Sequence, residues 1–155
     1  MPKKSPKAMP KIDFSEIPIW WPVCMNDSCP MAADCLRRQA AREAPASVTH
    51  WPAVLPSALS DGQCKYYQKA ETVRMARGLN AIYKNVRSRE AQHQIRMNLT
   101  WHFGSKGSYY RYKDGERWLS PEEQQYIIDV IRDNSGPVEV DFDEYRDTFD
   151  FTKAP

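Results

Sequence analysis

Four cysteines, all within the first 64 residues of this 155-residue chain, constrain its fold more than any other feature. They are Cys24, Cys29, Cys35 and Cys64, in the spacing C-x4-C-x5-C-x28-C, and no cysteine follows. Cysteines that only fill a core would scatter more evenly. A close group with one distant partner is typical of a tetrahedral thiolate metal site. The spacing therefore predicts one four-cysteine site at the front of the chain.

Three interpretations of these cysteines compete. The first is a structural metal site holding zinc, with an iron–sulfur cluster as the alternative because it uses the same four thiolates. The second is a set of ordinary buried cysteines, because the spacings of four and five residues depart from the commoner two-residue spacing. The third is two disulfides, although nothing in the sequence indicates the secretion that favours them.

The sequence shows no sign of membrane insertion or export. The longest nearly apolar stretch, residues 17–23, is far too short to span a membrane. The lysines near the N-terminus are followed by no apolar segment, so we read no secretory signal. We expect a cytoplasmic protein.

Composition changes divide the chain into three expected segments. Residues 1–11 are a flexible basic tail, 12–64 a cysteine-rich module, and 65–155 a helical domain. Within the cysteine-rich module, a short helix is expected from about residue 30 to 43. Prolines exclude a helix over 44–63.

The second half of the chain carries clear helix patterns. Apolar residues at helical spacing predict helices over 70–86 and 88–103. Ser88 is expected to cap the second of these, and Gly104 to end it. Another helix is expected over 120–135, because its opening Ser-Pro-Glu-Glu can form a capping box.

The connections between these helices predict the remaining elements. Aromatic-rich runs on either side of Asp114-Gly115 predict a β-hairpin near 108–119. Residues 138–140 are expected to form a short strand, and 142–149 one or two helical turns. The fold class is therefore α+β, mostly helical, with a cysteine-rich front module followed by helix, helix, hairpin and helix.

The net charge of +2 conceals two oppositely charged segments. Residues 65–113 hold 11 Lys or Arg and only 2 Asp or Glu, whereas residues 114–155 hold 4 and 12. Phosphates attract such cations, and exposed rings stack on unpaired bases. The residues expected to contact nucleic acid are Arg89, Arg96, Lys106, Tyr109, Arg111 and Lys113. The alternatives are a solvated basic face, or one that the acidic end covers.

Two resemblances accompany these patterns. Residues 29–36, Cys-Pro-x4-Cys-Leu, resemble the last cysteine pair of WhiB-like iron–sulfur regulators of transcription, but the spacing of the other cysteines departs from that family. More broadly, the chain is similar to a family of small bacterial proteins of unknown function. The motifs that carry this second resemblance are C-x-N-x2-C-P-x2-A-x-C-L-R over 24–37, then Y-Y-R-Y, G-E-R and L-S-P between 109 and 121. It implies a shared fold and no particular activity.

No pattern in the sequence indicates a catalysed reaction. The chain has no Gly-rich phosphate loop, no G-x-S-x-G or H-E-x-x-H motif, and no C-x-x-C redox pair. The leading prediction is a metal-stabilised regulatory or nucleic-acid-binding module without catalytic residues. The alternative is a protein-interaction adaptor in which Trp20, Trp21 and Trp51 present an apolar surface. A redox or other enzyme is the third possibility.

Overall fold

The computed structural model describes residues 9–153, which divide into two compact units. Unit 1 contains residues 9–72 together with 149–153, and unit 2 contains Val73–Thr148. The predicted division after residue 64 thus lies inside unit 1, and the sequence did not indicate that the end of the chain returns to this unit. Residues 1–8 of the expected basic tail lie outside the described residues.

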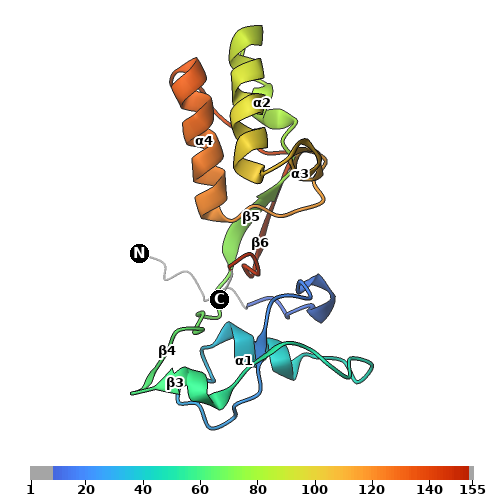
Figure 1. Ribbon diagram of the computed structural model, residues 1–155, viewed down its shortest axis with the longest axis vertical. Helices are drawn as coiled ribbons and strands as arrows, with labels where there is room; N and C mark the ends of the chain where they lie inside the picture. Colours follow the sequence, from blue (N-terminus) through green and yellow to red (C-terminus); the bar gives the residue numbers. More distant parts are fainter. Residues whose placement is uncertain (1–8, 154–155) are drawn as a thin grey trace, which may run out of the picture. The chain divides into compact units, whose positions relative to one another are not determined.

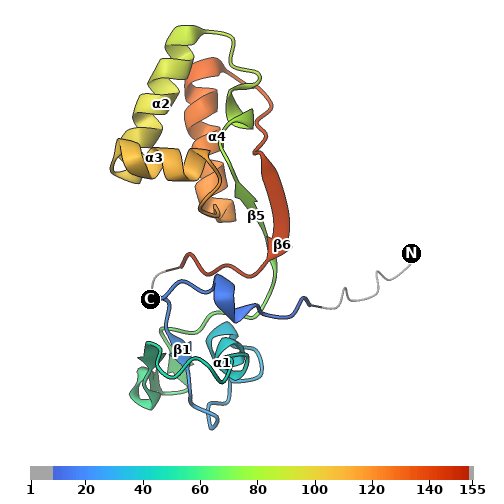
Figure 2. The same cartoon turned by 90° about the vertical axis from the view of Figure 1, so that its right-hand side faces the viewer.

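Unit 1 consists of short elements around one helix (Figures 1 and 2). They are η1 (Phe14–Glu16), β1 (Val23–Cys24), α1 (Leu36–Arg42), β2 (Ala53–Val54), η2 (Pro56–Ala58), β3 (Leu59–Ser60) and β4 (Gln63–Cys64). Strand β1 pairs in parallel with β2, and β3 pairs antiparallel with β4. Two-residue strands supply little stability themselves, so unit 1 depends on side-chain packing.

Apolar side chains from both ends of the chain fill the core of unit 1. Trp21 and Leu36 are fully buried at its centre. Phe149 and Phe151 join them, and the Phe151 ring meets the Trp21 ring edge-on with 5.0 Å between centroids. Large aromatic rings bury much apolar area, so this contact ties the end of the chain to the front.

Helix α1 is shorter than the predicted helix over 30–43. Residues 29–34 form turns instead, and Cys35 has an extended backbone as the N-cap of α1. The expectation that Cys35 lies inside the helix was therefore wrong. The reason is a non-local contact, because Cys35 forms a β-bridge with Lys69 and the Leu36 amide donates to the Gln68 carbonyl at 2.7 Å.

Unit 2 is a helical layer beside a two-stranded antiparallel sheet (Figures 1 and 2). Its elements are β5 (Val73–Arg77), η3 (Ala81–Tyr83), α2 (Arg89–Phe103), α3 (Lys106–Lys113), α4 (Pro121–Ser135) and β6 (Glu144–Thr148). Strands β5 and β6 pair in the register Val73 to Thr148 through Arg77 to Glu144. Helices α2 and α4 pack together, and the core between them includes the fully buried Ile95, Leu99 and Ile127.

The two longest helices confirm their predicted bounds. The Ser88 side chain accepts a hydrogen bond from the Ala91 amide at the start of α2, and Gly104 ends α2 in a left-handed conformation. Ser120 and Glu123 form the predicted reciprocal capping box at the start of α4. These ends depend on local sequence, which is why the sequence alone located them.

Residues 70–86 do not form the predicted helix. They form strand β5, a turn at Gly78 and the short helix η3. The apolar spacing matched a helix by coincidence, because β5 pairs with β6 and its Ala76 also bridges Leu119. The predicted helical turns over 142–149 are wrong for the same reason, since that stretch holds β6. No strand forms over 138–140.

The predicted β-hairpin near 108–119 is also wrong. Ser105 caps α3 by accepting a hydrogen bond from the Ser108 amide at 3.1 Å, and the helix continues to Lys113. The Asp114-Gly115 turn therefore follows a helix instead of joining two strands. Four α-helices and small sheets confirm the α+β class in the described residues. Within residues 9–153, every helix is too short or too polar to cross a bilayer.

Candidate functional site

The four cysteines come from four separate pieces of unit 1. Cys24 ends β1, Cys64 ends β4, Cys35 caps α1, and Cys29 lies in the loop between β1 and α1. Cys29 and Cys64 each begin a tight turn, in which the carbonyl accepts a hydrogen bond from the amide three residues later, at 3.0 Å in both cases. The turns and strand ends hold all four backbone positions around one region.

All four cysteines line one cavity of about 20 Å³. The remaining lining is largely apolar or aromatic and includes Met31, Ala32, Val54, Tyr66 and Tyr67. Each cysteine is a free thiol, and Cys35 is buried. Among the described residues, no group of three or more His, Cys, Asp or Glu is placed to hold a metal ion. The four thiols therefore do not lie in coordination geometry. The residue types fit a thiolate metal site, whereas their present spacing is more open than such a site requires.

A buried arginine lies against this cavity. Arg37 is only 3% exposed, and its guanidinium donates to the carbonyls of Tyr66 and Pro22, both at 2.8 Å. The same guanidinium lies 4.3 Å from the centroid of the Trp21 ring. Burial lowers the pKa of Arg37, and its interaction with the Cys35 thiol is the largest opposing effect. Because arginine stays protonated in proteins, a positive charge lies close to the cysteines.

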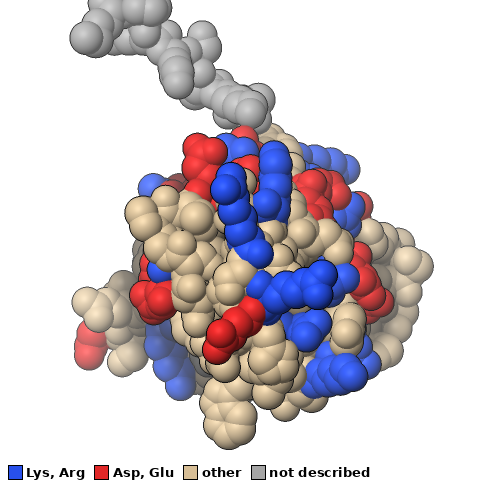
Figure 3. Space-filling model, turned by 90° about the horizontal axis from the view of Figure 1, so that it is seen from above, with Lys and Arg blue, Asp and Glu red and all other residues tan. Residues whose placement is uncertain are grey.

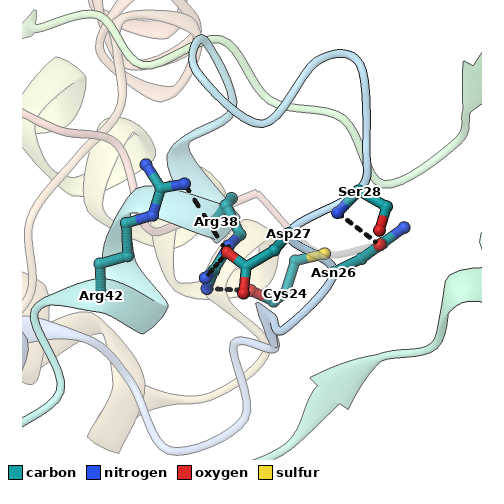
Figure 4. Close-up of polar contacts among 6 residues, drawn as sticks. All are labelled: Cys24, Asn26, Asp27, Ser28, Arg38 and Arg42. Carbon is teal, nitrogen blue, oxygen red and sulfur yellow. Dashed lines mark hydrogen bonds and ion pairs between the residues drawn. The ribbon is translucent and has the colours of Figure 1, made fainter.

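A second arginine fixes the loop between Cys24 and Cys29 (Figure 4). Arg38 forms an ion pair with Asp27 and also donates to the Cys24 carbonyl at 3.1 Å. The hydrogen bond from Arg38, followed by its charge, lowers the pKa of the Asp27 carboxyl. The Asn26 side chain accepts a hydrogen bond from the Ser28 amide at 3.1 Å and so shapes the rest of the loop. This network holds the loop from Cys24 to Ser28 in position.

Unit 2 contains a separate pocket of about 430 Å³ between the short helix η3 and helices α2 and α3. Its lining residues are Tyr83, Arg89, Gln92, His93, Arg96, Tyr109, Tyr110 and Lys113. We call it the basic pocket. None of the described residues that line it is acidic, whereas three carry a full positive charge. The volume is in the range of small-molecule sites.

Two tyrosines form the buried part of the basic pocket. The hydroxyl oxygens of Tyr83 and Tyr109 are 2.7 Å apart, and Tyr109 is only 1% exposed. Burial raises the pKa of both phenols. Tyr110 by contrast is 40% exposed, so its ring is accessible to a ligand. The pocket thus combines neutral hydroxyls, an accessible ring and cations.

Four of the six residues predicted to contact nucleic acid line this pocket. They are Arg89, Arg96, Tyr109 and Lys113. Lys106 and Arg111 are exposed on α3 but do not line it. Residues 106–113 form helix α3, in which residues four apart share a face, so Tyr109 and Lys113 lie on the same face.

Two acidic residues near the end of unit 2 contact residues that do not line the basic pocket. Asp143 accepts hydrogen bonds from the amides of Asn80 and Ala81, at 3.2 and 2.6 Å. Glu144 pairs with Arg77 at 2.7 Å. Figure 3 looks onto the end of unit 2 where α2 begins, and several Lys and Arg side chains lie together across the middle of that face. Among the described residues, no Asp or Glu lines the basic pocket.

The three tryptophans named for an adaptor surface do not form one. Trp21 is fully buried in the core of unit 1. Trp51 is half-buried and donates to the Trp21 carbonyl at 2.9 Å, so only Trp20 keeps half of its surface exposed. The apolar sequence around Trp21 gave no means of separating core rings from surface rings.

The comparisons with known proteins identify a family. Residues 7–151 match the model of a family of unknown function, DUF6078. The chain belongs to this family. The match includes all four cysteines and the whole basic pocket of this DUF6078 member. The resemblance to WhiB-like regulators is not shown.

No curated protein and no solved structure matches this DUF6078 chain. Sequence reasoning missed several residues at its two sites, above all Arg37 beside the cysteines and Tyr83 in the basic pocket. Arg37 looks like an ordinary charged helix residue in the sequence. Tyr83 was assigned to the apolar face of a helix that does not form.

Proposed function

We propose that this DUF6078 protein is a non-catalytic, metal-stabilised regulatory module that binds single-stranded nucleic acid in the basic pocket of unit 2. The observation that carries the proposal is the convergence of Arg89, Arg96 and Lys113 on one pocket, whose described lining holds no acidic residue. Like charges held together raise the local potential and attract anions. In a nucleic acid, the phosphate groups are the anions that this cluster of three cations would bind.

The aromatic residues favour a nucleic acid over a simple anion. The exposed ring of Tyr110 lies beside the cations, and the Lys113 ammonium is 6.0 Å from its centroid. A base stacks on such a ring while its phosphate meets the cations, and this combination is typical of single-strand binding. A duplex keeps its bases stacked inside, so it cannot use the ring in this way. We therefore infer a preference for single strands.

Unit 1 supplies the metal-stabilised part of this proposal. Its strands have two residues each, and its core is small. Zinc held by the four cysteines would add folding free energy, because such a site does not exist in the unfolded chain. An iron–sulfur cluster is the alternative cofactor with the same ligands.

Fluorescence anisotropy with a labelled single-stranded oligonucleotide tests the proposal. The protein should bind at low salt, and the triple variant R89Q/R96Q/K113Q should bind at least tenfold more weakly. The matched control is K106Q/R111Q, which removes exposed cations of α3 that do not line the pocket. Equal losses in both variants would indicate a diffuse charge effect and would contradict a specific pocket.

A protein-interaction adaptor is the second candidate. It is favoured by Trp101, which is 88% exposed on α2, with the half-exposed Met97 four residues before it. Exposed tryptophans are frequent centres of protein interfaces. If the oligonucleotide does not bind at low salt while W101A abolishes capture of a purified partner, the adaptor function replaces nucleic-acid binding.

A further inference from the structure

We infer that the cysteine cavity of unit 1 takes a single Zn²⁺ ion, and that Arg37 beside it supplies a positive charge that offsets part of the negative charge of the four-thiolate site. This inference rests on the metal-stabilised part of the proposed function, and it names the ion and the residue that sets its affinity. It is independent of nucleic-acid binding by unit 2.

The ligand set of the cavity fits a structural zinc site. All four cysteines that line it are free thiols, and four thiolates bind one Zn²⁺ ion tetrahedrally. An iron–sulfur cluster uses the same four ligands, and the visible spectrum of the loaded protein separates the two.

The surroundings of Arg37 indicate that an anion belongs in this cavity. Buried arginines are almost always paired with an opposite charge. Arg37 is buried, yet its hydrogen-bond acceptors are neutral carbonyls, and within residues 9–153 no carboxylate pairs with it. Arg37 lines the same cavity as Cys24, Cys35 and Cys64. Thiolates are thus the available counter-ions.

The unpaired charge of Arg37 would offset half of the net charge of a four-thiolate zinc site. Zinc with four thiolates carries a net charge of minus two, which is costly in an apolar cavity without compensation. Arg37 offers one positive charge, which no carboxylate within residues 9–153 neutralises. Arg38 also lines the cavity, but its charge is already paired with Asp27. Residues that support metal ligands in this way typically change metal affinity by about 10- to 100-fold.

Zinc titrations of the full chain in competition with a coloured chelator test the inference. The wild-type protein should bind one Zn²⁺, and R37M should bind it about 10- to 100-fold more weakly. R37K keeps the charge but cannot reproduce both hydrogen bonds, so it should lie closer to wild type than R37M does. R42M is the control, because Arg42 lies on the same helix without lining the cavity.

Cobalt substitution tests the four-thiolate site without R37M, in case that variant does not fold. Wild-type protein loaded with Co²⁺ should show the strong absorption bands of tetrahedral thiolate coordination, and C64S should lose them. Absence of zinc binding, or an iron- and sulfide-dependent visible spectrum, would overturn the single-ion site. Equal zinc affinities of R37M and wild type would overturn the role of Arg37. Oligonucleotide binding measured on the same samples separates these failures from failure of the nucleic-acid proposal.

Discussion

The hydroxyl oxygens of Tyr83 and Tyr109 lie 2.7 Å apart in the basic pocket, and each is the other's hydrogen-bond partner. Removing one should leave the other buried without a partner, which costs about 1–3 kcal/mol. We therefore expect Y83F to lower the free energy of unfolding by that amount. Y110F, which removes a hydroxyl from an exposed ring, should have little effect.

The double variant Y83F/Y109F separates the hydrogen bond from other effects of substitution. Because it removes both hydroxyls, no buried group is left unsatisfied, and its loss of stability should be smaller than the sum of the two single losses. Chemical denaturation of all four proteins gives the coupling free energy. Additive losses would show that the two hydroxyls do not depend on each other.

Alkaline pH should destabilise unit 2 through the same two residues. Burial raises the pKa of Tyr83 and Tyr109 above the ordinary tyrosine value of 10.0. The folded protein therefore keeps these protons while the unfolded chain loses them, so stability is intact below about pH 10 and falls as the pH rises further. Denaturation curves from pH 9 to pH 11.5 measure this fall, which Y83F/Y109F should reduce. Identical pH profiles for the two proteins would contradict it.

Acid should release the loop between Cys24 and Cys29. The hydrogen bond from Arg38 lowers the pKa of Asp27 below its ordinary 3.8. The ion pair therefore stabilises the folded chain above pH 3.8, and this stabilisation is lost as the pH falls through the lowered pKa of Asp27. Carbon-13 NMR of the Asp27 carboxyl follows this titration, and D27N should loosen the loop at neutral pH. A titration midpoint at or above 3.8 would show that the ion pair does not form.

Gly78 should be difficult to replace. It has a φ of +81°, and an added Cβ would lie 2.6 Å from the Cβ of Asp143. Both the backbone conformation and the collision oppose a side chain, so G78A should cost more than about 1 kcal/mol. G104A is the matched control, because Gly104 has a φ of +90° and open space around it. Thermal denaturation should show a larger loss for G78A than for G104A.

The sequence predicted those elements whose ends depend on neighbouring residues. Helices α2 and α4 were located because Ser88, Gly104 and the Ser120–Glu123 pair act within one turn of the chain. Strand β5 was missed because its partner β6 lies about 70 residues later and leaves no local pattern. Its apolar residues happened to fit a helical spacing as well.

The candidate sites were predictable to different degrees. The clustering of cysteines in the sequence was sufficient to group the four residues that line the cavity in unit 1. The role of Arg37 was not predictable, because burial of a charged helix residue depends on Trp21 and Tyr66 from other segments. In the basic pocket, the predicted set held Arg111 and lacked Tyr110, because the charge pattern alone does not show which side chains line a pocket.

The salt dependence of oligonucleotide binding distinguishes a phosphate-binding pocket from a solvated basic surface. Three cations that each displace a counter-ion from a single strand should contribute about −2 to the slope of log affinity against log salt concentration. Arg89, Arg96 and Lys113 are the three cations of the basic pocket. The wild-type slope should therefore be steeper than that of R89Q/R96Q/K113Q by about this amount, with K106Q/R111Q close to wild type. Equal slopes for wild type and the triple variant, or no binding at low salt, would contradict nucleic-acid recognition by this pocket.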